Sequence, residues 1–279
     1  MTKVVPAISR KERLRRIKEK SPNTIVTSEE DAWQFNILND QAALLSIQTF
    51  SIWDFKMDWK AFLKNAFATL EKQNIPNLII DIRYNGGGAD AVSLELFKHI
   101  SEKPITVPAR KDLYRFNQFP AKAKPYIGTW DNWFDKAIKK LQPLEEGYYS
   151  MNGKITKEQR YKPYKNTYEG KVYLLVSPFN SSATYYLAGA AKRQQIATLV
   201  GQETGGNLKG INGGQIYFMK LPNSKIELDL PISGVFPLTE QPDRGYLPDV
   251  LVIPKVEDVA NGVDTELEAV LAIIKNEIK

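Results

Sequence analysis

The sequence predicts an α/β fold, because two short apolar segments are each followed by a turn and a helical pattern. The first, "NLIIDIRYNGGG" (77–88), ends in three glycines and leads into a helix-like stretch at 89–101. The second, "KVYLLVS" (171–177), is followed by two adjacent serines and a helical pattern over 182–195. This order of strand, turn and helix is typical of α/β architectures.

Five further segments complete the predicted elements. Residues 42–50 and 197–202 are apolar and strand-like. Residues 58–74 place apolar side chains at helical spacing, and 263–279 form an amphipathic helical pattern. The stretch 213–236 is typical of an antiparallel hairpin with its turn at "PNSK".

Two segments depart from this pattern and set the predicted domain limits. Residues 104–170 are rich in Pro, Tyr, Trp and Lys, with one helical patch at 133–141. Such a long irregular insertion is either a lid or binding loop, or a structural excursion packed by its aromatic residues. Residues 1–38 are interpreted as a basic extension or the remnant of a preceding domain. The core then covers 39–279 and ends in the predicted C-terminal helix.

Charge and composition exclude several classes of function. Residues 1–20 hold eight Lys or Arg and two Glu, so the rest of the chain has 30 basic and 30 acidic residues. A neutral body does not predict a nucleic-acid partner, and the basic run is interpreted as a solvated segment. With no cysteine and one histidine, neither a zinc nor an iron site is expected, and no cofactor is predicted.

The sequence also bears on the membrane and on targeting. No run of about 18 apolar residues exists to span a bilayer. The first residues carry no apolar stretch after their charges, so they do not resemble a secretory signal peptide.

The glycine and serine turns each allow two interpretations. Three glycines after a buried strand form either a tight turn or a set of free amides that receive an anion. The order "GGGADA" matches neither the dinucleotide fingerprint nor the phosphate-loop pattern. In "NSSATYYLAG", the serine before the helix is either a plain N-cap or a nucleophile whose oxyanion the helix N-terminus stabilises.

Taken together, four segments in order resemble the core of the tail-specific (C-terminal processing) and tricorn-type serine peptidases. They are "NLIIDIRYNGGG", "VYLLVSPFNSSATYYLAGA", "LVGQETGGNLKG" and "RGYLPDV", within residues 40–255. The resemblance implies a β-α spiral fold of the Clp protease/crotonase type. It also implies serine peptidase activity on extended or unfolded polypeptides. Tail-specific members usually carry a PDZ-like domain before the core, where this chain has about forty residues.

Carried over by position, the resemblance assigns the nucleophile to Ser182, the second of the two serines. The oxyanion donors are the backbone amides of Gly88 and Ala183, and Gly87 is a supporting candidate. Since a serine is a weak nucleophile without a base, one further residue has to take its proton.

The general base is where this chain departs from the pattern. The lysine of tail-specific members aligns with Asn207, and a shift of two residues brings in Lys209, the base candidate. The histidine of tricorn-like members aligns most closely with Ser46, and their late acidic residue falls near Glu240 or Asp243.

Two base candidates compete on physical grounds. Lys209 can serve as a base only where burial favours its neutral form. His99 titrates in a suitable range, but its spacing with Val92 and Leu96 predicts a packed or surface helical residue.

Two other functions remain open from the sequence. The first is a catalytically weak or inactive peptide-binding protein on the same fold, since no standard base is present. The second is an acyl-transfer or acyl-thioester enzyme of the wider superfold, in which the Ser182 segment has no role. The predicted partner is a polypeptide. The resemblance favours a periplasmic or cell-envelope location without the leader, with the cytoplasm as the alternative.

Overall fold

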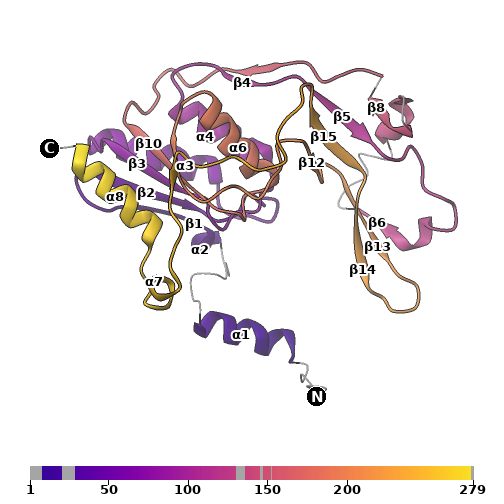
Figure 1. Cartoon of the computed structure of the whole chain (residues 1–279), viewed down its shortest axis with the longest axis horizontal. Helices are drawn as coiled ribbons and strands as arrows, with labels where there is room; N and C mark the ends of the chain where they lie inside the picture. The colour runs from indigo at the N-terminus through magenta and orange to yellow at the C-terminus, as the bar shows by residue number, and fades with distance from the viewer. Residues whose placement is uncertain (1–7, 21–28, 130–135, 145–146, 152, 278–279) are drawn as a thin grey trace.

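The computed structural model describes residues 8–20, 29–129, 136–144, 147–151 and 153–277. Within these residues a six-stranded sheet lies at the centre, in the order β1-β2-β3-β10-β11-β16 (Figure 1). Its strands are β1 (Trp33–Ile37), β2 (Ala42–Ile47), β3 (Asn77–Asp81), β10 (Lys171–Val176), β11 (Thr198–Gly201) and β16 (Val250–Leu251). Strands β2 to β16 pair in parallel, and β1 pairs antiparallel with β2. The predicted α/β class is confirmed.

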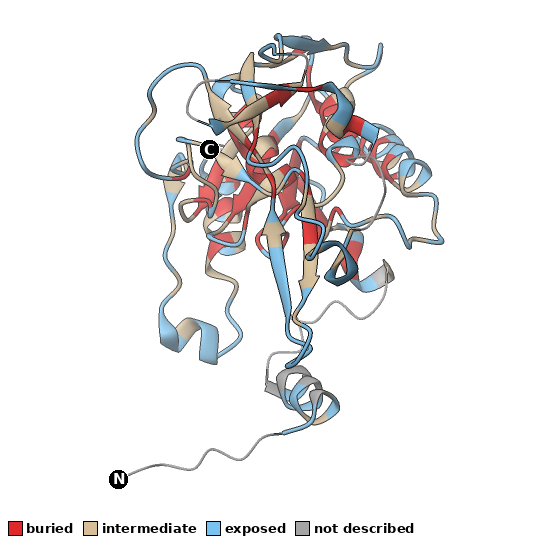
Figure 2. Ribbon diagram, turned by 90° about the vertical axis from the view of Figure 1, so that its right-hand side faces the viewer, coloured by how far each residue is buried: buried red, intermediate tan, exposed pale blue. Residues whose placement is uncertain are grey.

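Helices cover both faces of this sheet. The helices α3 (Trp59–Lys72), α4 (Asp90–Ile100) and α6 (Ser182–Arg193) pack on one face, and α8 (Thr265–Glu277) packs on the other. Successive side chains of a strand point to opposite faces. In β10, Leu174 therefore joins the cluster under α3, α4 and α6, whereas Leu175 packs with Val270 and Ile274 of α8. Figure 2 shows buried residues concentrated in these layers.

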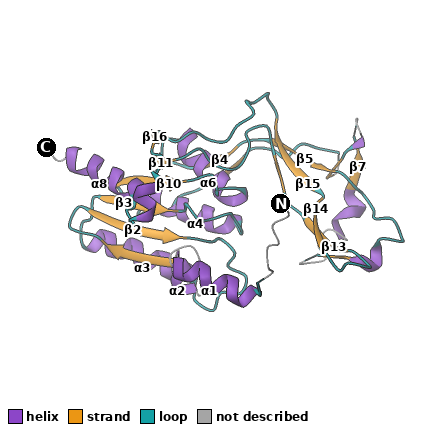
Figure 3. Cartoon of the chain, turned by 60° about the horizontal axis from the view of Figure 1, so that its bottom comes forward, coloured by secondary structure: helices purple, strands orange, loops and turns teal. Residues whose placement is uncertain are grey.

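A second lobe consists of short strands beside the helical layers (Figure 3). A five-stranded sheet has the order β12-β15-β5-β8-β7, and a three-stranded sheet has the order β14-β13-β6. Their strands are β5 (Arg110–Tyr114), β6 (Ile127–Gly128), β7 (Leu141–Pro143), β8 (Tyr149–Met151), β12 (Ile211–Asn212), β13 (Ile216–Lys220), β14 (Glu227–Pro231) and β15 (Ser233–Pro237). Tyr114, Leu141, Tyr217 and Ile232 form a small core of their own in this lobe.

The insertion thus contains more regular structure than its sequence predicts. Two of its segments, β4 (Ile105–Val107) and β9 (Gln159–Tyr161), pair with each other, and others pair with the hairpin after α6. The helical patch predicted at 133–141 lies partly outside the described residues. Its described part holds a 3-10 turn at Ile138–Lys140 followed by β7. The predicted hairpin at 213–236 is confirmed as β13 and β14.

The remaining elements lie toward the two ends of the chain. The strand β1 belongs to the central sheet, although it lies inside the segment 1–38 that the sequence sets apart. Ahead of it are α1 (Arg10–Lys20) and α2 (Glu29–Ala32), and α7 (Val256–Ala260) precedes α8. In the part of the chain that the structure describes, no helix has the length and apolar character needed to cross a bilayer.

Candidate active site

The glycine turn and the serine turn meet at one edge of the central sheet. Strands β3 and β10 are parallel neighbours, with Leu175 opposite Asp81 in register. Because both chains leave the sheet at the carboxyl ends of these strands, the turns that follow lie side by side. This edge is where open α/β sheets usually place their functional sites.

The glycine turn has a backbone that other residues rarely adopt. Gly87 and Gly88 have φ angles of +116° and +137°. A β-carbon on Gly88 would lie 2.2 Å from the carbonyl carbon of Phe50, so the two backbones touch. The Phe50 amide donates to the Gly87 carbonyl at 3.0 Å, and the Ala89 amide donates to the Phe50 carbonyl at 2.8 Å. Phe50, in the segment after β2, therefore holds the glycine turn in place through its backbone.

The two adjacent serines of this turn differ in backbone conformation and in hydrogen bonding. Ser182 is the first residue of α6 and has a φ of +49°, in the left-handed region that few non-glycine residues occupy. Ser181 has extended backbone, and its hydroxyl donates to the Gly86 carbonyl at 2.9 Å. Across the described residues, no group forms a hydrogen bond with the Ser182 hydroxyl. A non-glycine residue held in this conformation is an observation from which function can be inferred.

Two backbone amides beside Ser182 have unused hydrogen-bonding capacity. Neither Gly88 nor Ala183 donates its N–H to an acceptor among the described residues. A β-carbon placed on Gly87 would lie 2.8 Å from the β-carbon of Ser182 and 3.2 Å from the Ala183 nitrogen. The glycine turn and the first turn of α6 are therefore in direct contact. Amides at this position, at the positive end of a helix, are suited to stabilise an oxyanion.

Asn85, which the sequence analysis did not single out, holds the two turns together. It is fully buried, its side-chain amide donates to the Ile47 carbonyl at 2.9 Å, and its oxygen accepts from the Gly87 amide at 2.9 Å. Its backbone carbonyl accepts from the Asn180 side chain at 3.1 Å and from the Thr184 hydroxyl at 2.9 Å. Each polar group of Asn85 is thereby used to position the turns.

Asn180 does the same from the serine side, and it was also missed. Its side chain accepts from the Ser177 amide at 2.8 Å and donates to the Ile82 carbonyl at 2.6 Å. Its backbone carbonyl accepts from the Gly205 and Gly206 amides at 2.9 and 3.1 Å. One signal was available, since an asparagine directly precedes each turn in "YNGGG" and "FNSS".

Lys209 lies in the loop after β11, in contact with Asp243. Its ammonium is 3.3 Å from the Asp243 carboxylate, and 56% of its side chain is exposed. Asn207 also donates to Asp243, at 2.7 Å. This amide and the ammonium of Lys209 lower the pKa of Asp243. The structure thus brings Asn207, Lys209 and Asp243 together, and it shows no contact between Lys209 and the Ser182 hydroxyl.

The other two supporting candidates lie elsewhere. Ser46 is buried in β2, in register with Asp81, and lines a separate cavity of about 710 Å³ together with Asp81 and Arg83. Glu240 is exposed in the loop before Asp243. Neither side chain forms a contact with Ser182 that is seen in the described part of the chain.

His99 is a packed residue of α4. Its ring stacks on Phe67 of α3 with centroids 4.4 Å apart, and its Nε2 atom lies 3.8 Å from the Glu95 carboxylate. Burial is the largest cause that lowers the pKa of His99 from its ordinary value of 6.5, and Glu95 partly opposes it. These contacts give His99 a role in packing, as the helical spacing predicts.

The buried imidazole should make folding sensitive to mild acid. The unfolded chain binds a proton at His99 near pH 6.5 and the folded chain does so only at lower pH, so stability falls as pH drops through that range. We expect this loss to occur between pH 7 and 5. The replacement His99→Phe, which keeps a ring on Phe67, should reduce this loss in urea unfolding. An unchanged pH slope would contradict the assignment.

A cavity of about 540 Å³ lies close to this edge, between α4, α6 and the second lobe. Its walls are mostly apolar and come from α4, the β4 and β9 strands of the insertion, α6, the loop 207–211 after β11, and the stretch 235–246 that includes β15. Representative lining residues are Phe97, Ile105, Tyr161, Tyr185, Tyr186, Leu208 and Phe236. Tyr185, in the first turn of α6, is the lining residue nearest to Ser182 along this helix.

In the described ranges, no group of three or more His, Cys, Asp or Glu side chains is placed to hold a metal ion.

Comparisons with known proteins identify a family and a fold. The model of Peptidase family S41 matches residues 42–241. No match was found by sequence among curated proteins.

Solved structures share the fold at low identity. A protein of Parabacteroides merdae ATCC 43184 is 19% identical with a TM-score of 0.58, over 92% of this chain and 72% of its own. Mature CPAF is 16% identical with a TM-score of 0.56, over 84% of this chain and 52% of its own. A protein of Bacteroides fragilis NCTC 9343 is 14% identical with a TM-score of 0.54, over 90% and 59%. The chain thus spans about half the length of CPAF, and these structures show the fold.

Proposed function

Since this chain belongs to peptidase family S41, we propose that it is a serine peptidase that cleaves extended or unfolded polypeptides through an acyl-enzyme on Ser182. The observation that carries the proposal is the left-handed conformation of Ser182 beside two amides with no acceptor, those of Gly88 and Ala183. In this reaction the Ser182 hydroxyl attacks a peptide carbonyl, whose oxygen becomes negatively charged. The two amides stabilise that charge, which is the effect expected of an oxyanion hole.

The apolar cavity beside α6 supports a polypeptide as the substrate. Its lining includes Tyr185 in the first turn of α6 and strands of the insertion 104–170. An extended chain bound across the sheet edge can place an apolar side chain there. In this proposal the insertion forms one wall of the peptide groove.

Lys209 is the proposed base, and its pairing with Asp243 sets the condition under which it can accept a proton. To accept the proton of Ser182 its amine must be neutral, whereas in the structure its ammonium lies 3.3 Å from the Asp243 carboxylate. In this proposal, a bound substrate displaces water from this loop and separates Lys209 from Asp243, so that the amine can be neutral. Asn207 and Asp243 then serve to hold the loop, and Glu240 and Ser46 stay as supporting candidates.

The pH dependence tests this assignment. With Lys209 as base, cleavage of an unfolded polypeptide should rise between pH 6 and about 10 as the amine loses its proton. The Lys209→Ala variant should lose this rise, and a gel or fluorescence assay of cleavage at each pH measures it. A Lys209→Ala profile that matches the wild type excludes Lys209 as the base.

A second candidate function is a peptide-binding protein with weak or no turnover. The observation that favours it is that no side chain in the described residues forms a hydrogen bond with the Ser182 hydroxyl, while Lys209 is exposed and paired with Asp243. Binding of unfolded polypeptide without cleavage over the whole pH range would support this function over the first.

We also propose a periplasmic or cell-envelope location, by analogy with the tail-specific group. Cell fractionation with an antibody against the chain tests it, and recovery in the cytoplasmic fraction alone would contradict it.

A further inference from the structure

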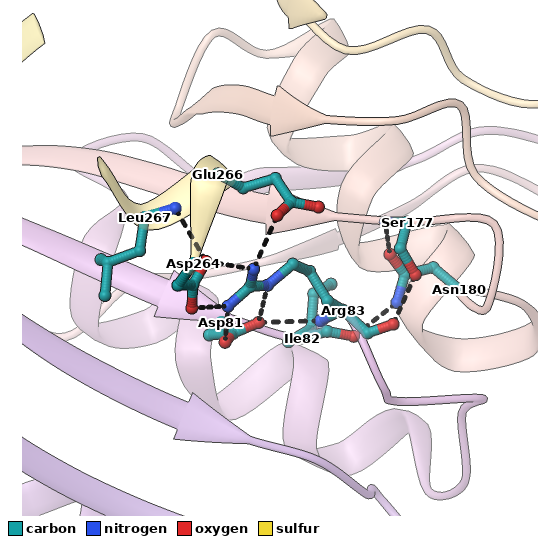
Figure 4. Close-up of polar contacts among 8 residues, drawn as sticks. All are labelled: Asp81, Ile82, Arg83, Ser177, Asn180, Asp264, Glu266 and Leu267. Atoms are coloured by element: carbon teal, nitrogen blue, oxygen red, sulfur yellow. Dashed lines mark hydrogen bonds and ion pairs between the residues drawn. The ribbon is translucent and has the colours of Figure 1, made fainter. Parts of the chain in front are cut away.

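Four charged residues form a largely buried cluster at the end of β3, named here the Arg83 cluster: Asp81, Arg83, Asp264 and Glu266 (Figure 4). The Arg83 guanidinium donates to both oxygens of Asp81, at 3.0 and 2.7 Å, and to both oxygens of Asp264, at 2.6 and 2.7 Å. It also donates to Glu266 at 3.1 Å. Asp264 directly precedes α8 and Glu266 lies in its first turn, so the cluster joins that helix to β3.

The cluster holds Arg83 in one orientation. Burial alone would lower the pKa of Arg83, but its hydrogen bonds with Asp264 and Asp81 outweigh this and raise it. The guanidinium is therefore charged, and its planar fork matches two carboxylates at once. Arg83 cannot rotate without breaking several charged hydrogen bonds in a desolvated place.

The same stretch of backbone carries the nucleophile turn. The Asn180 side chain donates to the Ile82 carbonyl at 2.6 Å, and the Ser177 hydroxyl donates to the Arg83 carbonyl (Figure 4). On the side of the glycine turn, the backbone amide of Asn85 donates to the Ile82 carbonyl at 2.9 Å. The peptide units of Ile82 and Arg83 thus contact both turns of the site.

We propose that Asp264 and Glu266 are positioning residues, which fix the oxyanion amides and Ser182 relative to each other through Arg83. The inference rests on the proposed function, since it assigns a catalytic purpose to the first turn of α8. Neither carboxylate touches the Ser182 side chain. They act by holding the Arg83 side chain. This fixes the backbone of Ile82 and Arg83, whose carbonyls accept hydrogen bonds from both turns.

The other end of α8 offers a matched control. Glu277 pairs with Lys171 at 2.9 Å and accepts from the Tyr173 hydroxyl at 3.0 Å, at the amino end of β10. That contact also attaches α8 to the sheet, but it lies at the opposite end of the strand from the turns. The Glu277 pair is more exposed than the Arg83 cluster, so thermal unfolding of each variant is needed beside kcat for the comparison.

The variants Asp264→Asn, Glu266→Gln and Glu277→Gln each remove a charge and keep the side-chain shape. Asparagine is as good an N-cap as aspartate, so Asp264→Asn preserves the bond to the Leu267 amide. We expect Asp264→Asn and Glu266→Gln to lower kcat about tenfold or more with KM changed less than about twofold, because small displacements of reacting groups are costly. Glu277→Gln should keep kcat.

A conservative variant and a stability measurement separate positioning from folding. Arg83→Lys keeps the charge but not the fork, so it should not retain the wild-type kcat. Thermal unfolding of every variant identifies any that is merely unstable. Equal losses of kcat in Asp264→Asn and Glu277→Gln, or unchanged kcat in Asp264→Asn and Glu266→Gln, would overturn the inference.

A readout that needs no turnover keeps this inference distinct from the proposed function. The backbone amide NMR signals of Gly88 and Ala183 should shift in Asp264→Asn and stay in place in Glu277→Gln. If the wild type cleaves nothing, the proposed function fails while these signals still decide whether the cluster positions the turns. Signals that stay at their wild-type positions in Asp264→Asn would overturn the inference.

Discussion

Replacing Ser182 by alanine is expected to abolish covalent labelling by a fluorophosphonate probe, whereas Ser181→Ala keeps it. The two hydroxyls differ in what they bind: that of Ser181 donates to the Gly86 carbonyl, and that of Ser182 has no partner in the described residues. A nucleophile has to be free to attack, and the first residue of α6 is adjacent to the Ala183 amide. Loss of the nucleophile in assembled serine peptidase sites lowers kcat by about a thousandfold or more.

The experiment compares wild type, Ser182→Ala and Ser181→Ala by labelling rate and by cleavage of an unfolded polypeptide. Circular dichroism and thermal unfolding show that each variant is folded. Ser181→Ala loses one hydrogen bond to the glycine turn, so a moderate decrease in rate is expected there. Labelling of Ser182→Ala at the wild-type rate would rule out Ser182 as the nucleophile.

The second large effect is expected at the glycine turn. Gly88→Ala should destabilise the protein by at least about 3 kcal/mol, because its β-carbon would overlap backbone and its φ is strained for alanine. The added atom would lie 2.2 Å from the Phe50 carbonyl carbon and 2.4 Å from its oxygen, at a φ of +137°. Unlike a side-chain tip, a backbone carbonyl cannot rotate away.

Gly86 supplies the control within the same three glycines. No atom lies within 4 Å of a β-carbon built there, and its φ is outside the left-handed region. Gly86→Ala should therefore change stability by no more than about 0.5 kcal/mol. Urea unfolding of both variants measures the difference, and equal midpoints for Gly86→Ala and Gly88→Ala would show that the contact with Phe50 is not rigid.

Much of the central layer could be predicted from the sequence. Apolar runs such as "NLIID" and "KVYLLV" read as buried strands, and the spacing of apolar residues in 58–74 and 263–279 predicted α3 and α8. These are local patterns, and the structure confirms them. The insertion 104–170 was harder, because β5 and β6 pair with strands 90 or more positions away and its short strands carry little periodicity of their own. For example, β5 pairs with β15, with Tyr114 opposite Ser233.

The sequence also indicated some residues of the candidate site and missed others. The order of the glycine and serine turns indicated Ser182, Gly88 and Ala183, and these assignments stay predictions for the labelling experiment. Asn85 and Asn180 went unnoticed because their role depends on contacts with residues almost a hundred positions apart in the chain. The pairing of Lys209 with Asp243, which bears directly on its use as a base, also could not be read from neighbours in sequence.

The sequence by itself determined the α/β class, the positions of the main helices and the two turns that follow β3 and β10. Each of these depends on side chains within one short stretch, where apolar spacing and backbone freedom act locally. Only the tertiary structure decided which serine is free, how Phe50 supports Gly88, and how Asp264 reaches Arg83. These features arise when distant segments pack together, because hydrogen bonds and steric contacts depend on distance in space and not on separation along the chain.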